Sequence, residues 1–226
     1  MSRNDVILCV PDLHCPWIHK EKVAKMLALI PEIKPTHVVC LGDSYDMHSF
    51  SKFPRSLNIL TPEDEIVQAR ECMEEIWAAI NRSAKKAKKY QLKGNHSTRI
   101  NKRLMEKFPE LESLLNINHL WEFPGVTTIS DDKMELVIND ISFIHGHFTK
   151  LGDHVKQMNR SIICGHSHRL GLFYLNRDDK TLFEMNCGYL ASPYAKPLIY
   201  RPMKRFFDWT HGFGVVDKLG PRIIHL

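Results

Sequence analysis

Residues 6–14 read VILCVPDLH, an apolar, β-branched run that leads into a carboxylate and an imidazole at alternate positions. A short apolar run of this kind favours a buried β-strand. Residues two apart in an extended segment point to the same side, so Asp12 and His14 can bind one cation together. An Asp-x-His pair also arises by chance, and a lone histidine at a strand end is more often solvated or hydrogen-bonded than a metal ligand. The pair therefore gains its meaning from the rest of the chain.

Four further polar clusters follow apolar runs, which occupy residues 38–41, 90–92, 141–144 and 162–164. Each cluster begins where its run stops, and the last repeats the alternate spacing with two histidines. We therefore expect five strands to deliver metal-ligand side chains from their carboxyl ends, an arrangement that chance explains poorly. The four clusters are Gly42-Asp43, Gly94-Asn95-His96, His145-Gly146-His147 and Gly165-His166-Ser167-His168.

Helical and strand signals alternate through the first half of the chain, and strands dominate the second half. Thr61-Pro62-Glu63-Asp64 predicts a capped helix start, after which apolar residues recur at helical spacing as far as Ala87. The pattern predicts an α/β fold with two layers of sheet and helices outside them, in which the second half of the chain is mostly antiparallel. The other expected helices cover residues 20–29, 98–107 and 110–115, and the other expected strands cover residues 126–129, 135–138, 172–175, 182–185, 214–216 and 222–224.

The composition is that of an ordinary globular protein, with 226 residues, 43% of them hydrophobic and 25% charged. We expect a single domain over residues 1–226. No apolar run reaches the roughly 20 residues that span a bilayer, and no signal-peptide pattern is present, so a cytoplasmic protein with no membrane partner is expected. The six cysteines lack metal or redox spacing and are interpreted as reduced core thiols. The basic run at residues 85–89 is expected to end a helix, with a nucleic-acid patch as the alternative.

The ordered clusters resemble the signature of the calcineurin-like metallophosphoesterases, which runs Asp-x-His, Gly-Asp, Gly-Asn-His-Asp/Glu, His and Gly-His-x-His. The resemblance spans Asp12 to His168. It implies a four-layer α/β/β/α sandwich of two mixed sheets flanked by helices, and hydrolysis of phosphate esters at a dinuclear metal site. It also implies that one metal is held by Asp12, His14 and His168, and that the other is held by Asn95, His145 and His166. Asp43 would bridge the two metals.

Two divalent cations roughly 3.5 to 4 Å apart can each bind a phosphoryl oxygen, and together they can activate a shared water as hydroxide. The expected ligands are carboxylates, imidazoles and an amide, without any thiolate. Such a set suits Mn²⁺, Fe²⁺ or Zn²⁺, and the resemblance favours Mn²⁺.

His96 is expected to act on the substrate rather than on a metal. By the resemblance it would stabilise charge on the phosphoryl group or protonate the leaving oxygen, which makes His96, Asn95 and Asp43 the expected catalytic residues. Ser97 departs from the family, because an acid usually stands there and orients the histidine. Asp46 is the candidate to replace that acid.

Three more residues are candidates for substrate contacts. His147 would share one side of a strand with His145, and Arg99 and Arg169 each lie just past a ligand cluster, where a guanidinium could bind a phosphate in bidentate fashion. His147 could equally be exposed or structural, and either arginine could be a simple surface residue.

Residues 44–60 and 188–212 are irregular and rich in aromatic and basic side chains. Such stretches can stack bases and hold phosphates, and they can also pack a loop or a subunit interface. With the net charge of +5, they favour phosphodiesters of nucleic acids or nucleotides, nuclease activity included, over phosphoproteins or small phosphomonoesters. Some members of the fold have lost ligands and serve as interaction scaffolds. Here the seven ligand positions and the position of His96 are all filled, which favours catalysis.

Overall fold

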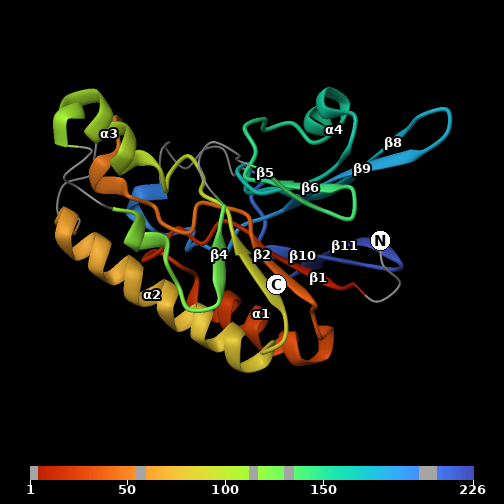
Figure 1. Ribbon diagram of the computed structural model, residues 1–226, viewed down its shortest axis with the longest axis horizontal. Coiled ribbons are helices and arrows are strands. Elements are labelled where there is room, and N and C mark those ends of the chain that lie inside the picture. Colours follow the sequence, from red (N-terminus) through yellow and green to blue (C-terminus); the bar gives the residue numbers. More distant parts are fainter. Residues whose placement is uncertain (1–4, 54–59, 112–116, 130–134, 199–207) are drawn as a thin grey trace.

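The computed structural model describes residues 5–53, 60–111, 117–129, 135–198 and 208–226. Two mixed sheets face each other, with α1 (Lys20–Ile33) and α2 (Pro62–Ser83) outside the first and α4 (Asp153–Met158) outside the second (Figure 1). The four-layer sandwich expected from the resemblance is therefore confirmed. No helix within the described ranges is both long and apolar enough to cross a membrane.

The first sheet has the strand order β11-β10-β1-β2-β3-β4. Its centre is parallel, because β1 pairs with β2, β2 with β3 and β3 with β4 in the same direction. β10 runs antiparallel to β1, and β11 completes a hairpin with β10. The strands are β1 (Ile7–Val10), β2 (His37–Cys40), β3 (Lys88–Gln91), β4 (Val126–Thr128), β10 (Gly212–Asp217) and β11 (Gly220–His225).

The second sheet has the order β5-β6-β7-β9-β8. β6, β7 and β9 are parallel, whereas β5 and β8 are antiparallel edge strands. The second half was expected to be mostly antiparallel, but the three central strands of this sheet are parallel to one another. The strands are β5 (Glu135–Ile138), β6 (Ile141–Ile144), β7 (Ser161–Cys164), β8 (Leu170–Asn176) and β9 (Thr181–Cys187).

Burial of both faces explains why the first strand is apolar throughout. Leu8 and Val10 pack with the helices of the outer layer, while Ile7 and Cys9 pack between the two sheets. A parallel strand covered on both sides needs apolar residues at consecutive positions, which is the pattern that the sequence shows. The rigid strands then fix the positions of the residues that follow them.

The start of α2 is as expected, but its end differs. Thr61 caps the helix by accepting a hydrogen bond from the Asp64 amide at 3.2 Å. The helix stops at Ser83, so the basic run at 85–89 does not end it. Lys88 instead begins β3, where its amide donates to the Thr36 carbonyl at 2.9 Å, because pairing with β2 overrides local helix propensity.

The other expected strands, and the helices expected at 20–29 and 98–107, are present, most of them with shifted ends. α3 covers Arg99–Lys107. The short 3₁₀ helices are η1 (His48–Phe50), η2 (Pro109–Leu111), η3 (Asn118–Trp121) and η4 (Lys196–Leu198). The helix expected at 110–115 begins within η2, and residues 112–116 lie outside the described ranges. The short helix α4 was not expected. Five of the six cysteines are buried.

Candidate metal centre

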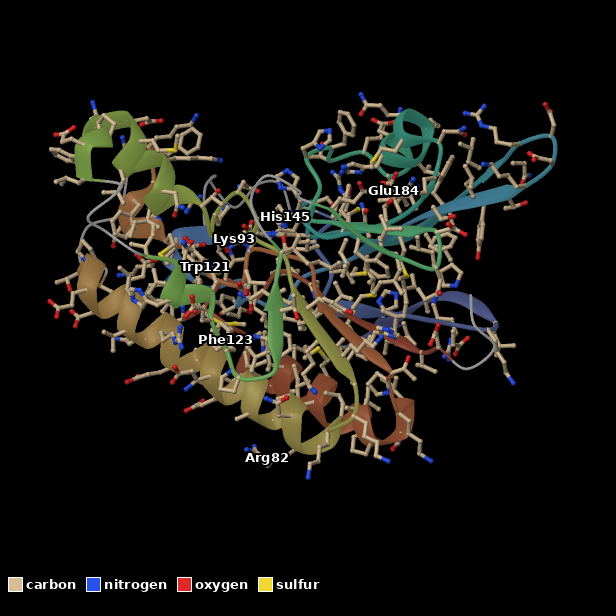
Figure 2. The ribbon with its side chains drawn as sticks, viewed as in Figure 1. Arg82, Lys93, Trp121, Phe123, His145 and Glu184 are labelled. Carbon is tan, nitrogen blue, oxygen red and sulfur yellow. The ribbon has the colours of Figure 1, made fainter. Side chains whose placement is uncertain are left out.

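All five polar clusters converge where strands of the two sheets end. His145 follows β6 and lies near the middle of the molecule, between the sheets (Figure 2). Four residues of the clusters adopt left-handed backbone angles, with φ of 51° at His14, 41° at Asp43, 64° at His166 and 58° at His168. This conformation is costly for residues other than glycine and concentrates at functional sites.

The first expected ligand set comes together as a buried group. His14 Nε2 and His168 Nε2 lie 3.0 Å apart, and His168 Nε2 lies 3.2 Å from Asp12 Oδ2. Burial lowers the pKa of His14, so its ring is neutral and Nε2 can offer a lone pair. Two ring nitrogens and a carboxylate oxygen thus face one point, and their three side chains can hold a metal ion.

The second expected set comes together in the same way. Asn95 Oδ1 lies 2.9 Å from both His145 Nε2 and His166 Nδ1. Burial and the neighbouring His145 lower the pKa of His166 to about 4, which keeps its ring neutral near pH 7. An amide oxygen and two imidazole nitrogens therefore meet beside the first set.

Asp43 lies between the two sets. Its Oδ2 lies 3.1 Å from His145 Nε2, and its Oδ1 accepts hydrogen bonds from the amides of His96 at 2.7 Å and Ser97 at 3.4 Å. Groups of potential metal ligands join Asp43 both to His14 and to His145. The carboxylate thus lies within reach of ligand atoms from both sets.

The centre attracts positive charge. Burial works against ionisation of Asp43, but His145 and His96 hold the pKa of its carboxyl well below the usual value. Burial also disfavours a charged His145, yet Asp43 and Asp12 outweigh it and raise the pKa of His145 to about 9. Two buried carboxylates therefore stabilise a cation strongly here, and the donor atoms fit divalent metals.

Asp46 provides the carboxylate that Ser97 lacks. Despite complete burial, which alone would raise its pKa, hydrogen bonds from His14 and His96 lower the pKa of Asp46. Its Oδ2 lies 2.9 Å from His14 Nδ1 and 3.2 Å from His96 Nδ1, and Arg99 Nη1 donates to its Oδ1 at 3.1 Å. Ser97 instead accepts a hydrogen bond from the Tyr45 amide at 3.4 Å.

Arg99 lies beside His96. Its Nη2 lies 3.0 Å from His96 Nε2, while its Nη1 donates to the Asp46 carbonyl at 3.0 Å. With the His96 Nδ1 proton directed to Asp46, Nε2 accepts from the guanidinium. Arg99 and His96 therefore form one polar edge of the site.

The other two substrate candidates lie apart from the ligand sets. The His147 side chain is exposed, and its ring packs against His154 with centroids 5.1 Å apart. Arg169 donates to the Thr149 carbonyl and lies 3.5 Å from Asp208. No side-chain contact joins either residue to the expected ligands within the described ranges, so their substrate roles stay predictions.

Two glycines of the motifs are needed for space. A Cβ on Gly94 would overlap the carboxylate of Asp43 and come within 2.5 Å of its amide nitrogen. A Cβ on Gly165 would overlap the carboxylate of Asp12. Both glycines therefore let the carboxylate of one cluster approach the backbone of another.

A buried histidine that belongs to none of the sequence motifs supports the fourth cluster. His154, in α4, accepts hydrogen bonds at Nε2 from the amides of His147 at 3.1 Å and Phe148 at 3.2 Å. Its Nδ1 lies 3.3 Å from Glu184, which lies beneath α4 in Figure 2. Together with Cys164 these side chains form a further group with metal-ligand atoms. Cys164 Sγ donates to Asn186 at 2.6 Å, and burial holds the pKa of its thiol well above the usual value, so we interpret the group as structural.

No protein-family model matches the sequence, and a search of curated proteins found no match. Similar solved structures include Vacuolar Protein Sorting 29 from Cryptosporidium parvum, with 14% identity, a TM-score of 0.48, and 98% of this chain and 96% of that chain covered. The phosphoesterase YfcE from E. coli has 17% identity and a TM-score of 0.43 over 94% of this chain and 88% of that chain. The nuclease MPE from Pseudomonas putida has 12% identity and a TM-score of 0.40 over 100% of this chain and 88% of that chain. All three have the calcineurin-like metallophosphoesterase fold, and at these identities the likeness concerns the fold alone.

Proposed function

We propose that the protein is a metal-dependent phosphoesterase with a dinuclear centre. The position of Asp43 supports this most directly, because one of its oxygens is held by backbone amides while the other faces His145. The donor set contains no thiolate and suits Mn²⁺, Fe²⁺ or Zn²⁺, of which we propose Mn²⁺. The proposed ligands are Asp12, His14 and His168 for one ion and Asn95, His145 and His166 for the other, with Asp43 shared.

When bound, two such cations supply Lewis acidity toward phosphoryl oxygens and lower the pKa of water. The chain's own contribution is to orient these groups. Asp46 accepts hydrogen bonds from Nδ1 of both His14 and His96. It therefore directs Nε2 of His14 toward the metal position and Nε2 of His96 toward Arg99. A ligand and a substrate-facing histidine are thereby oriented by one carboxylate.

His96 and Arg99 are the proposed substrate-facing groups. Arg99 can place an N–H next to a phosphoryl or leaving-group oxygen, where a positive group stabilises developing negative charge. His96 does the same when its Nε2 also carries a proton, and that proton can then be delivered to the leaving oxygen. We propose phosphodiesters of nucleic acids or nucleotides as substrates, because basic side chains gather beside this edge of the site.

The experiment compares bis(p-nitrophenyl) phosphate with p-nitrophenyl phosphate, using chelator-treated protein with and without added Mn²⁺. We expect nitrophenol release only with metal, and faster from the diester. Asp43→Asn should lower kcat about 100-fold or more, because it removes the shared charge. Asp179→Asn is the matched control, since Asp179 is exposed in the turn between β8 and β9.

Two results would contradict the proposal. If the protein binds Mn²⁺ but hydrolyses neither compound, it is a metal-bound interaction scaffold rather than an enzyme. If the monoester is the faster substrate, the activity is that of a phosphomonoesterase and the diester proposal is wrong.

A further inference from the structure

A hollow of about 340 Å³ lies between the segment around η1 and helix α3 and opens next to the proposed metal centre. η1, in orange, packs against α3, in yellow-green, at the edge of the molecule (Figure 1). Asn95 and Arg99 both line this hollow. Asn95 is also a proposed metal ligand, and Arg99 contacts His96. A molecule in the hollow would therefore continue directly into the reaction site.

The walls of the hollow are strongly basic. Lys52, Arg99, Lys102 and Arg103 line it, and among the described lining residues only Glu106 carries a carboxylate. Arg103 lies 3.6 Å from Glu106, and Arg99 is paired with Asp46. Neither Lys52 nor Lys102 has an ion pair with another described residue.

These two lysines carry positive charge that no described carboxylate neutralises. Phosphate groups outside the metal centre would be their natural counter-ions, and each such contact releases counterions from a nucleic-acid strand. A small phosphomonoester has no second phosphate to place here.

An exposed aromatic ring completes the hollow. The Phe53 side chain is 61% exposed, although its ring is large and apolar, and it lines the same wall as Lys52. The Lys52 ammonium lies 5.7 Å from the centroid of this ring. A largely exposed ring beside cations is the usual platform for stacking an unpaired base. A base paired within a duplex could not stack in this way.

We propose that this hollow binds single-stranded nucleic acid next to the phosphodiester that is cleaved. Lys52 and Lys102 contact strand phosphates, and Phe53 stacks on a base. The inference rests on the proposed phosphoesterase function and narrows it to one substrate class. It leaves DNA and RNA as the two sources of the strand.

Binding is measured by fluorescence anisotropy with labelled oligothymidylate and oligouridylate, in the presence of chelator so that no strand is cleaved. Phe53→Ala should weaken binding about tenfold, because stacking is lost. Lys102→Glu should make the slope of log K against log salt shallower by about 0.7, the share of one phosphate contact on a single strand.

Two matched controls lie elsewhere on the molecule. Tyr174→Ala removes an aromatic ring that is 52% exposed on β8. Lys86→Glu reverses an exposed charge in the turn after α2. This turn lies four residues beyond Arg82, at the lower edge of Figure 2, whereas α3 lies at the upper left. Both controls should bind the oligonucleotides like the unaltered protein.

The Mn²⁺-loaded enzyme provides a second readout. The ratio of kcat/KM for the oligonucleotide to kcat/KM for bis(p-nitrophenyl) phosphate should fall about tenfold in Phe53→Ala and stay constant in both controls.

The inference is overturned if Phe53→Ala and Lys102→Glu bind the strands as tightly as the unaltered protein, or if Lys86→Glu weakens binding equally. It is also overturned if heparin binds as tightly as the strand and Phe53→Ala has no effect, because the hollow would then be a general polyanion site. Failure of the phosphoesterase proposal looks different: the unaltered protein itself would not hydrolyse bis(p-nitrophenyl) phosphate with Mn²⁺.

Discussion

Replacing Asp46 with asparagine removes a buried negative charge that contacts three partners at once. In the native protein its carboxylate accepts from His14 and His96 and pairs with Arg99. An asparagine side chain keeps one acceptor oxygen and turns two N–H donors toward groups that are themselves donors. Both histidines contact Oδ2, whereas Arg99 contacts Oδ1, so an asparagine keeps either the two histidine contacts or the Arg99 contact. In both orientations the Arg99 guanidinium loses its counter-ion.

The cost in stability follows from burial. Breaking a fully buried ion pair costs about 3 to 5 kcal/mol. The Arg99 side chain is 13% exposed and keeps its hydrogen bond to the carbonyl of residue 46, so the lower part of that range applies. We expect Asp46→Asn to lower the free energy of unfolding by about 3 kcal/mol.

The cost in function is separate. Loss of the partner that orients a metal-binding histidine typically reduces metal affinity or activity about 10- to 100-fold. We expect that loss in the Mn²⁺ affinity measured by calorimetry, and a similar fall in kcat for bis(p-nitrophenyl) phosphate. Chemical denaturation gives the stability, with Asp179→Asn as the control. Unchanged Mn²⁺ affinity and unchanged stability in Asp46→Asn would refute the role assigned to this carboxylate.

Three further predictions concern other parts of the site. His154 and the Val155 amide donate to Glu184 and, against the effect of burial, lower the pKa of its carboxyl. The ionised carboxylate therefore stabilises the folded protein fully above the unfolded pKa near 4.5, and this stabilisation is lost as the pH falls below it. Glu184→Gln should therefore be less stable than the unaltered protein by about 1 to 3 kcal/mol at pH 7, and a denaturation series should show the difference shrinking below about pH 4.5, whereas a constant difference would argue against the charge. Gly94→Ala should abolish Mn²⁺ binding in calorimetry while circular dichroism stays native, because the new methyl group displaces the Asp43 carboxylate; native affinity would mean that the loop simply moves aside. His96→Ala should lower kcat about 100-fold for esters with poor leaving groups and less for nitrophenyl esters, and equal turnover on both would remove it from catalysis.

The sequence predicted the strands well where burial dictates it. β6 is at residues 141–144 as expected, because three of its four buried residues are apolar and the polar ligands begin where the strand ends. β3 was misplaced by two residues because it begins with Lys88 and Lys89. Lys89 is 5% exposed and donates from Nζ to the Ala87 carbonyl, a contact that the pattern of a basic run does not indicate.

The ligand sets could be anticipated from strand-end motifs, but their supports could not. Asp46 was selected only as a substitute, since its contacts to His96 and Arg99 join residues about fifty positions apart. α4 was missed because six residues are too few to show a helical period, and with it the role of His154. Contacts of this kind depend on how loops close in space, which local patterns do not encode.

Electron paramagnetic resonance of the Mn²⁺-loaded protein tests the central claim most directly. If Asp43 bridges two sites, the protein should bind two Mn²⁺ ions per chain with the broadened, temperature-dependent signal of exchange-coupled ions. Asp43→Asn should lose the coupling, and Asp179→Asn should keep it. A single Mn²⁺ per chain, or two ions with the sharp six-line signal of isolated Mn²⁺, would contradict a dinuclear centre.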